Sequence, residues 1–336
     1  MRTVAIICLV LAFQAGCKSS LEEAIKHNDE GEFDKARELA LEACDRGEGG
    51  GCSLLAWLWR NGEGGAADMD QARDYFLKAC HRDQADACNE AGIMWFAGRG
   101  GKRDGAEARH YFEKACGGGS AAGCNNLGAM WFAGDGGLPN KPKAADYFDK
   151  ACEGGDARAC DTLGELWFLG KGVSEDRKKS RAFYSKACDL GDARGCFDFR
   201  QMWSRGEGGP KDMEKAAQLD VKVRKLAKEE CDAGNSWSCI KMAEQWRVGH
   251  GGEKDEAKAR QYFLKACDMG DGAGCLFLAG MWEKGLGGPK DLAKADELNA
   301  RGFGTPVPIG SPEVHDRLSH GKKPGAKKPV IPSRTP

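Results

Sequence analysis

The sequence lacks the features that mark several common functional classes. Its N-terminal apolar run, residues 4–13, is 10 residues long and too short to cross a bilayer as a helix. Its formal net charge is −1, so no overall field attracts nucleic acid. It contains neither a Cys-x-x-Cys nor a His-Glu-x-x-His motif, which are typical of redox-active thiol pairs and of zinc hydrolases. These absences predict a protein without cofactor, metal ion or nucleic-acid partner.

The N-terminal apolar run suits the hydrophobic region of an export signal. It is followed by Ala15-Gly16-Cys17, which resembles the lipobox of bacterial lipoproteins, with Gln14 where Leu is usual. In a lipobox the cysteine is lipidated and becomes the first residue of the mature chain. We expect residues 1–16 to be a signal peptide and Cys17 to anchor an exported protein in the bacterial periplasm or at the outer membrane. Ordinary cleavage without lipid, which would give a secreted protein, is the alternative.

Cysteine is abundant, with 16 residues, and its distribution is regular. One cysteine lies in the signal and Cys17 is assigned to the lipid, which leaves an even set. This set forms seven pairs, each separated by eight positions: Cys44 and Cys52, Cys80 and Cys88, Cys116 and Cys124, Cys152 and Cys160, Cys188 and Cys196, Cys231 and Cys239, and Cys267 and Cys275. An even set with none left over is typical of an oxidising compartment.

The cysteine pairs mark a repeat. First cysteines of successive pairs are 36 residues apart, except for the 43 residues between Cys188 and Cys231. Seven residues after each second cysteine stands a tryptophan, followed three and five residues later by glycines, as in Trp59, Gly62 and Gly64. A fixed period of this length predicts a solenoid.

Each period is predicted to form two helices. The first helix begins near the second cysteine and ends at the Gly-x-Gly, because glycine readily adopts the left-handed conformation of a helix cap. The second helix has apolar residues at helical spacing, as in residues 70–80. An Asp or Asn such as Asp192 or Asn235 often stands where it can cap the next first helix. The seven extra residues of the long period fall in its second helix, around 220–230, and should add nearly two turns.

These columns resemble the Sel-like repeat family, relatives of the tetratricopeptide repeats. The resemblance rests on a first helix that ends in aromatic-x-x-Gly-x-Gly and a second helix with Ala-x-x-Tyr/Phe-x-x-Ala. It implies an all-α fold, a right-handed α-solenoid of about seven 36-residue helix pairs over residues 44–302. Residues 17–43 are expected to form capping helices. Residues 303–336 are rich in proline and lysine and are expected to form a disordered tail.

The repeated Cys-x7-Cys pair admits three interpretations. A zinc site usually brings cysteines two to four residues apart, whereas here the spacing is eight and the six histidines are out of register with the repeats. A redox-active pair would normally read Cys-x-x-Cys. A disulfide across the tight turn between two helices needs Cα atoms about 5.5 Å apart, which this turn can provide. We favour the disulfide, which would join each repeat to the next and contribute about 2.5 kcal/mol of stability.

The tryptophans and the glycine loops have structural interpretations as well. The tryptophan column could be a ligand cage, but with the apolar residues three and six positions after the second cysteine it forms a stripe typical of a buried core. The Gly-x-Gly-Gly loops could bind phosphate, yet they follow helices and lack a Gly-Lys-Ser/Thr ending, so we interpret them as turns.

The family resemblance also raises an enzymatic alternative, because some cysteine-rich bacterial members are named β-lactamase-like or penicillin-binding. Ser-x-x-Lys, the spacing of penicillin-recognising enzymes, occurs at Ser238 and Lys241 and again at Ser319 and Lys322 in the tail. The Ser-Asp-Asn and Lys-Thr-Gly elements that accompany this motif are absent. We therefore predict no catalytic residue and keep hydrolysis of β-lactams or cell-wall material as the rival function.

One face of the first helices is the candidate binding surface. Positions one, five and eight residues after the second cysteine share this face, and their occupants vary while the other columns repeat. Aromatic residues and arginine often anchor interfaces. The candidates on this face are Trp57, Arg60, Ile93, Phe96, Phe132 and Phe168; for the three phenylalanines, packing between repeats is an equal alternative. We predict an exported, lipid-anchored scaffold that binds a protein or peptide.

Overall fold

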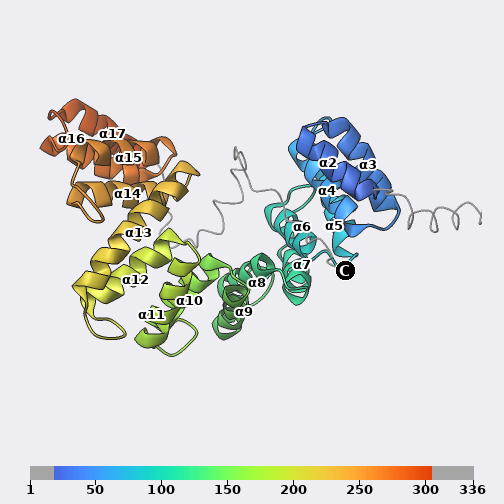
Figure 1. The fold of residues 1–336 in the computed structure, drawn as a ribbon, viewed down its shortest axis with the longest axis horizontal. Helices are drawn as coiled ribbons and strands as arrows, with labels where there is room; N and C mark the ends of the chain where they lie inside the picture. Colours follow the sequence, from blue (N-terminus) through green and yellow to red (C-terminus); the bar gives the residue numbers. More distant parts are fainter. Residues whose placement is uncertain (1–18, 305–336) are drawn as a thin grey trace, which may run out of the picture. The chain divides into compact units, whose positions relative to one another are not determined.

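The computed structural model of the chain describes residues 19–304, which form sixteen α-helices and no β-strand (Figure 1). The helices are α2 (Ser20–Glu30), α3 (Phe33–Asp45), α4 (Gly49–Asn61), α5 (Met69–Cys80), α6 (Ala85–Ala97), α7 (Gly105–Gly117), α8 (Ala121–Ala133), α9 (Lys141–Glu153), α10 (Ala157–Leu169), α11 (Arg177–Asp189), α12 (Ala193–Arg205), α13 (Met213–Asp232), α14 (Ser236–Val248), α15 (Glu256–Asp268), α16 (Gly272–Lys284) and α17 (Leu292–Gly304). The expected signal at 1–16, the lipidation site Cys17 and residues 305–336 lie outside this range.

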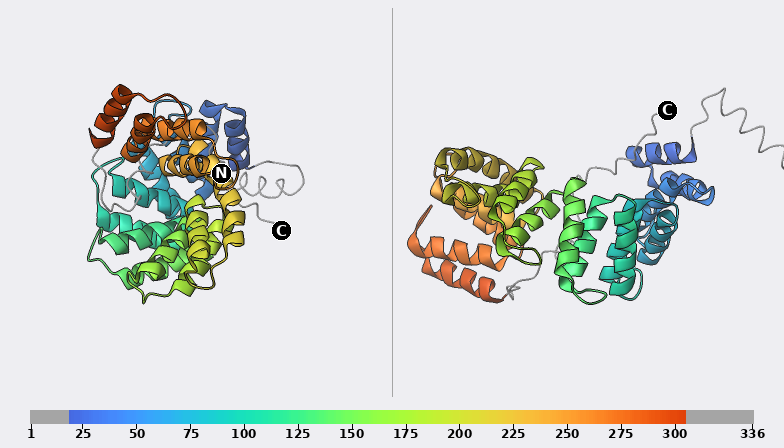
Figure 2. Two further views of the ribbon diagram at one scale, coloured as in Figure 1. Left: turned by 90° about the vertical axis from the view of Figure 1, so that its left-hand side faces the viewer. Right: turned by 90° about the horizontal axis from the view of Figure 1, so that it is seen from below.

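The described residues divide into two compact units, each built from stacked helix pairs (Figures 1 and 2). One unit contains α2 to α8 and the other contains α9 to α17. Within a unit each helix packs mainly on the helices next to it in the chain, as α6 does on α7 and α10 on α11. The predicted all-α repeat fold is thereby confirmed.

Helix boundaries follow from capping residues at fixed positions. Each first helix of a repeat ends at a glycine whose φ lies between 65° and 84°, a left-handed conformation that costs glycine little. The first helices α10, α12, α14 and α16 begin at Asp156, Asp192, Asn235 and Asp271, whose side chains accept hydrogen bonds from backbone N–H groups as expected. The second helices α5, α7, α9, α11, α13 and α15 begin at a further set of such caps: Asp68, Asp104, Asn140, Asp176, Asp212 and Asp255.

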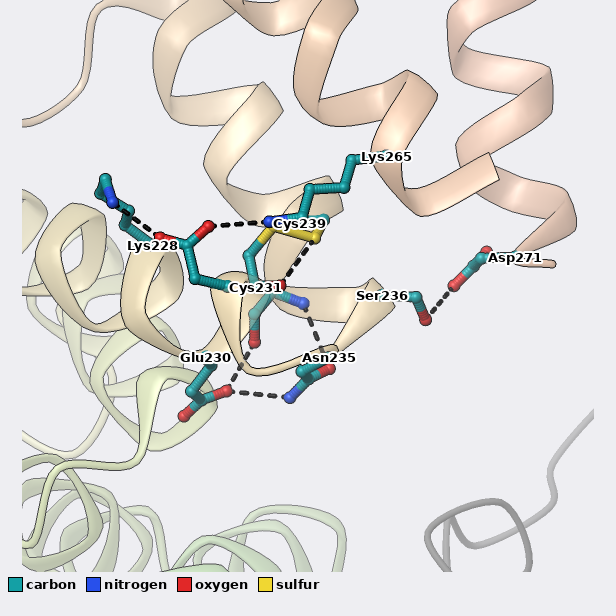
Figure 3. The surroundings of a disulfide bond; sticks show 10 residues. Lys228, Glu230, Cys231, Asn235, Ser236, Cys239, Lys265 and Asp271 are labelled. Carbon is teal, nitrogen blue, oxygen red and sulfur yellow. Dashed lines mark hydrogen bonds and ion pairs between the residues drawn. A yellow bond between two sulfur atoms is a disulfide. The ribbon is translucent and has the colours of Figure 1, made fainter. Parts of the chain in front are cut away.

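Seven disulfides join the repeats at the turn between a second helix and the next first helix, with Cα atoms 4.2 to 4.7 Å apart. They link Cys44 to Cys52, Cys80 to Cys88, Cys116 to Cys124, Cys152 to Cys160, Cys188 to Cys196, Cys231 to Cys239 and Cys267 to Cys275. These are the pairs that the eight-residue spacing predicts. Figure 3 shows the turn closed by Cys231 and Cys239.

Close approach of the helices at these turns depends on a small residue before the second cysteine. At Gly274, an added Cβ would lie 2.7 Å from the Cβ of Ala266, the residue before Cys267. At Gly195, an added Cβ would collide with the Cβ of Ala187. In six of the seven pairs, two such small residues therefore let the cysteines come into bonding range. The Cys231–Cys239 pair has Glu230 and Ser238 at these positions instead, joined by a hydrogen bond.

The long repeat lengthens one helix without disturbing its apolar side. Helix α13 has 20 residues where the other second helices have 12 or 13. Its residues Ala216, Val223 and Ala227 are all buried, at spacings of seven and four that keep them on one side of a helix. Asp220 lies between them and is buried with its carboxylate 2.9 Å from Nε of Arg200. The predicted insertion is therefore accommodated as two added turns.

Each tryptophan of the column is half-buried and lies under a cation from a neighbouring helix. The expected core stripe is thus confined to the residues three and six positions after the second cysteine, most of which are fully buried. In six repeats an arginine of the preceding second helix covers the ring, with its guanidinium carbon 3.3 to 4.5 Å from the ring centroid: Arg37 over Trp59, Arg73 over Trp95, Arg109 over Trp131, Arg181 over Trp203, Arg224 over Trp246 and Arg260 over Trp282. Because the chain itself covers this ring face, the tryptophan is part of the repeated scaffold of caps, disulfides and packed side chains, which we call the frame, and does not form a ligand cage.

The glycine loops enclose the same arginines. The Arg260 guanidinium donates to the carbonyl oxygens of Met281 and Pro289 at 3.1 and 3.2 Å. A Cβ at Gly288, the last glycine of that loop, would lie 2.9 Å from the guanidinium. In the repeat where Ala145 replaces the arginine, Val173 replaces this glycine. The loops are turns fitted around an arginine.

The ends of the array differ slightly from the expected boundaries. Helix α3 of the capping pair continues through Cys44 to Asp45, so the boundary at 43 falls inside a helix. Helix α17 continues to Gly304, two residues into the predicted tail. Its last turn packs on α16, because a Cβ at Gly302 would lie 2.7 Å from the side chain of Leu276. No helix between residues 19 and 304 is long and apolar enough to span a membrane.

Candidate binding face on the first helices

The first helices lie on the inner side of each stack. Three pairs of alternate helices, α2 with α4, α6 with α8 and α10 with α12, contact each other, and no two successive second helices between residues 19 and 304 come as close. In a curved stack the elements that approach each other lie on the inside of the curve. Positions one, five and eight after the second cysteine point away from the buried columns at three and six. We call the surface formed by these variable positions the inner face.

On α4 and α6 the inner face carries a closed cluster, which we call the front cluster. The Arg60 guanidinium lies 3.5 Å from the centre of the Trp57 ring and donates to a Glu90 carboxylate oxygen at 2.6 Å. The Trp57 ring also makes an edge contact with buried Phe76, with centroids 6.0 Å apart. Both charged side chains are only about one-fifth exposed, at 22% and 19%.

Burial perturbs both members of this ion pair. It lowers the pKa of Arg60, and the nearby Glu90 carboxylate opposes that effect. It raises the pKa of Glu90, and Arg60 opposes that effect in turn. Two of the predicted binding residues, Trp57 and Arg60, therefore interact with each other, and Arg60 is paired with Glu90 within the chain. The sequence had not indicated Glu90 as a partner.

The remaining predicted residues occupy varied environments. Ile93 is half-buried beside the front cluster on α6. Phe96 is buried, with the Arg103 guanidinium 4.9 Å from its ring centre, which favours packing at that position. Phe132 on α8 and Phe168 on α10 are half-buried, and the Phe168 ring lies 4.4 Å from Arg177.

In the second unit, α10, α12 and α14 bring a group of acidic residues together on the inner face. Arg194 lies between Asp161 and Glu165, with nitrogen–oxygen distances of 3.5 and 3.7 Å. Burial raises the pKa of Asp161 well above its usual range, and the nearby carboxylates of Asp192 and Asp198 add to this. Burial likewise raises the pKa of Asp198 to about 6, against the attraction of Arg194.

An aromatic pair continues this group toward α14. Phe197 and Trp237 make an edge contact with ring centroids 6.1 Å apart. The ammonium of Lys241 lies 4.7 and 5.4 Å from the two ring centres and donates to Glu244 at 2.9 Å. This part of the inner face therefore mixes acids, cations and aromatic rings within reach of one another.

On α14 and α16 the inner face is hollowed by a groove of about 290 Å³, which we call the rear groove. Its lining residues are Glu244, Arg247, Phe263, Leu276, Phe277, Gly280, Met281, Lys284 and Leu286. Phe263 and Met281 are almost fully buried and form its floor, while Phe277 is 47% exposed and stacks on Phe263 with centroids 5.3 Å apart. At Gly280 an added Cβ would meet no atom within 4 Å.

Several of the lining residues occupy the predicted inner-face columns, yet none was among the predicted binding residues. Gly280 stands at the position that Trp57 and Ile93 occupy in α4 and α6. Phe277 stands two residues after the second cysteine, at the position of Glu90. The signal in the sequence was that α16 has the smallest residue of one column, Gly280, and the only aromatic residue of the other, Phe277.

The Ser-x-x-Lys motif at Ser238 and Lys241 does not form a reactive pair. The Ser238 hydroxyl is fully buried and donates to Glu230 at 2.5 Å. Glu230 also accepts from the side chain of Asn235 (Figure 3). Lys241 donates to Glu244 instead. The second copy of the motif, at Ser319 and Lys322, lies outside the described residues.

One group among residues 19–304 has the residue types of a metal site. His27, Glu30 and Glu32 lie near the turn between α2 and α3, with His27 Nδ1 2.6 Å from a Glu32 oxygen. The two carboxylates are exposed, and the imidazole already has a hydrogen-bond partner. The cysteines are all paired with one another in this range.

Comparison with protein families finds one match along the chain. The family model described as Sel1 repeat matches residues 51–83, 85–120, 121–156, 157–192, 203–219, 238–271 and 272–295. The gap after residue 219 coincides with the two added turns of α13. No curated protein matches the chain significantly.

Solved structures with the same architecture include bacterial repeat proteins. A protective antigen present in uropathogenic Escherichia coli strains, displaying an SLR fold, is 25% identical with a TM-score of 0.59, over 84% of this chain and 64% of that one. This chain thus spans less than two-thirds of that protein. A Sel1 repeat protein from Oxalobacter formigenes is 21% identical with a TM-score of 0.62, over 74% of this chain and 97% of that one.

Proposed function

Because the chain belongs to the Sel1 repeat family, we propose that it is an exported, lipid-anchored scaffold that binds other proteins along its inner face. The observation that carries this proposal is the contrast between columns. Capping glycines, disulfides and arginine-covered tryptophans recur from repeat to repeat, whereas the inner face changes in size, charge and polarity. A repeated frame with a variable face is suited to recognising partners rather than to one fixed reaction.

Export is supported by the cysteines. Seven disulfides between residues 44 and 275 indicate an oxidising, extracytoplasmic location. The signal at 1–16 and lipidation of Cys17 complete the proposal, and mass spectrometry of the mature N-terminus tests them. We expect a lipid-modified Cys17, and a Cys17→Ser chain that is released from the membrane. An unmodified mature N-terminus would remove the anchor from the proposal.

Site-specific photo-cross-linking tests the binding face. A photoreactive phenylalanine analogue in place of Phe168 or Phe277 should give adducts with other proteins in the host cell envelope. The same analogue at Asp74 or Gln261, which are exposed on the second helices α5 and α15, is the matched control. Adducts that form equally from the second helices, or from neither set, would contradict the proposal.

The rival function, hydrolysis of β-lactams, is favoured by no contact in the described residues. Ser238 is buried and Lys241 is bonded elsewhere. Nitrocefin turnover by the oxidised chain, abolished by Ser238→Ala, would restore this alternative.

A further inference from the structure

We propose that the rear groove between α14 and α16 binds a partner segment that carries one bulky apolar side chain flanked by carboxylates. This inference rests on the proposed function, because it names the class of partner that the inner face accepts. The inference goes beyond the proposed function because it assigns the contact to the nine residues that line the groove and gives the chemistry of the partner segment.

The shape of the groove suits a single side chain. Its volume of about 290 Å³ lies at the lower end of the range for ligand pockets, which favours one anchor rather than a cofactor. Its floor is apolar, since Phe263 and Met281 are buried beneath it and Leu276 and Phe277 form its wall. Gly280 keeps it open, because any larger side chain there would project into it.

The rim of the rear groove carries two positively charged side chains that form no ion pair among residues 19–304. Arg247 and Lys284 are exposed, and neither has a carboxylate within ion-pair distance among residues 19–304. The one acid of the lining, Glu244, is bonded to Lys241 at 2.9 Å. Two free cations beside an apolar floor complement an acidic, hydrophobic segment.

A further carboxylate lies near Arg247 but is committed elsewhere. Lys254 lies 2.7 Å from a Glu256 oxygen. The hydrogen bond from Lys254 is the main cause of the lowered pKa of Glu256, whereas the charge of Arg247 has the smallest effect on that pKa. Arg247 is therefore left for a carboxylate of the partner.

The same charges disfavour the chain's own tail as the occupant. Residues 304–336 hold six lysines and arginines against two acidic residues. A basic segment would be repelled by Arg247 and Lys284 rather than attracted. The occupant is therefore assigned to another protein.

Fluorescence polarisation with three labelled peptides tests this assignment on the oxidised, full-length mature chain. The first peptide has one phenylalanine with two acidic residues on each side, the second replaces the phenylalanine with alanine, and the third replaces the acids with lysine. We expect the first to bind at least about tenfold more tightly than the second. We expect no saturable binding of the third, and weaker binding of the first at high salt.

Three variants place the peptide in the groove. Gly280→Ile introduces the residue found at the matching position of α6 and should weaken binding at least about tenfold while leaving the circular dichroism spectrum unchanged. The double variant Arg247→Glu with Lys284→Glu should weaken it similarly. Arg205→Glu, an exposed charge reversal at the column of Lys284 but on α12, is the control and should have no effect.

Binding that survives Gly280→Ile, or a preference for the lysine peptide, would overturn the inference. A chain ending at Gly304 that binds the acidic peptide about tenfold more tightly would also overturn it, because the groove would then belong to the tail. Self-association abolished by Gly280→Ile would assign the groove to a second copy instead. If the peptides fail while photo-cross-links form from the inner face, the scaffold function stands and only the partner class is wrong.

Discussion

The front cluster and the rear groove occupy equivalent places in two helix pairs and have opposite properties. Arg60 of α4 and Arg247 of α14 stand at the same position after their second cysteines. Arg60 meets Glu90 of the next first helix at 2.6 Å, whereas Arg247 faces a repeat that has Phe277 at that position. Five residues after the second cysteine, α6 has Ile93 and α16 has Gly280. This difference in side-chain size helps decide whether the surface is filled or hollow.

This comparison shows that the frame and the face of the array are independent. Both regions have the same disulfide, the same capping glycine and the same arginine over tryptophan. The front pair satisfies its charges within the chain, so it contributes to stability. The rear pair leaves its cations in solvent, so it is available for a partner.

The largest expected effect concerns the acidic group that lies between these regions in the sequence. The pKa of Asp198 is raised to about 6 by burial, so the folded chain holds this proton more tightly than the unfolded chain does. The free energy of unfolding should therefore fall by up to about 3 kcal/mol as pH rises from about 4 to about 6, and level off above that range. The groups near Asp198 are Arg194, Asp192, Asp161 and Glu165 of α10, Tyr184 of α11 and Lys241 of α14.

Urea denaturation of the oxidised chain between about pH 4 and pH 7 measures this slope. The Asp198→Asn variant cannot ionise there and should lose the contribution of Asp198, and adding Asp161→Asn should remove the further contribution of Asp161, whose pKa burial also raises. Glu165→Gln, whose carboxylate is more exposed, should retain both contributions. Equal slopes in the wild-type and Asp198→Asn chains would contradict the assignment.

Exchanging residues between the front and rear positions should have unequal costs. Glu90→Phe leaves the largely buried Arg60 guanidinium without its carboxylate and should destabilise the first unit by about 2 kcal/mol. Phe277→Glu gives Arg247 a partner in solvent but removes the stacking of Phe277 on Phe263, so it should lower stability by only about 1 kcal/mol. Hydrogen exchange of α4 and α6, against α14 and α16, measures both effects locally; equal losses would break the comparison.

Removing the arginine over the tryptophan should cost the same in both regions. Arg73→Ala and Arg260→Ala each expose one face of Trp95 or Trp282 and should each lower stability by about 1 kcal/mol. The repeat with Ala145 shows that the frame tolerates the loss. Thermal denaturation of the two variants provides the measurement, and a loss confined to one end would show that the frame is not uniform.

The smallest expected effect is at the inner-face glycine. Gly280→Ala should stabilise α16 by about 0.5–1 kcal/mol, because the helix gains an alanine and the added Cβ meets no atom within 4 Å. Gly92→Ala on α6 is the matched control, where the Cβ would lie 2.7 Å from the Phe112 ring and should destabilise. Chemical denaturation separates the two signs; destabilisation by Gly280→Ala would mean that the groove is not open.

Most of the frame could be predicted from sequence because it repeats. The capping glycines, the cysteine pairs and the added turns of α13 each show as a fixed column or as one departure from it. The pairing of an arginine with six of the tryptophans was missed because the two residues of a pair, such as Arg37 and Trp59, stand 22 residues apart in different helices. Packing between helices, and not helical periodicity, brings them together.

The binding face was predicted only in outline. Its columns were identified, but the residues two positions after the second cysteine were left out, and these decide its character: Glu90, Asp198, Lys241 and Phe277. Glu90, Lys241 and Phe277 each contact a side chain of the neighbouring repeat, and Asp198 is influenced by charges on both neighbouring repeats, so these roles depend on how the helices pack. A single sequence shows which residues vary, whereas the geometry of the stack determines which of them are paired within the chain.

Hydrogen exchange of the full-length oxidised chain, with and without the acidic phenylalanine peptide, tests the central claim most directly. The account predicts added protection in α14 and α16, with none in the equivalent α4 and α6, and its loss in the Gly280→Ile chain. Protection that appears equally at the front cluster, or that survives Gly280→Ile, would contradict the division of the inner face into a closed front and an open rear.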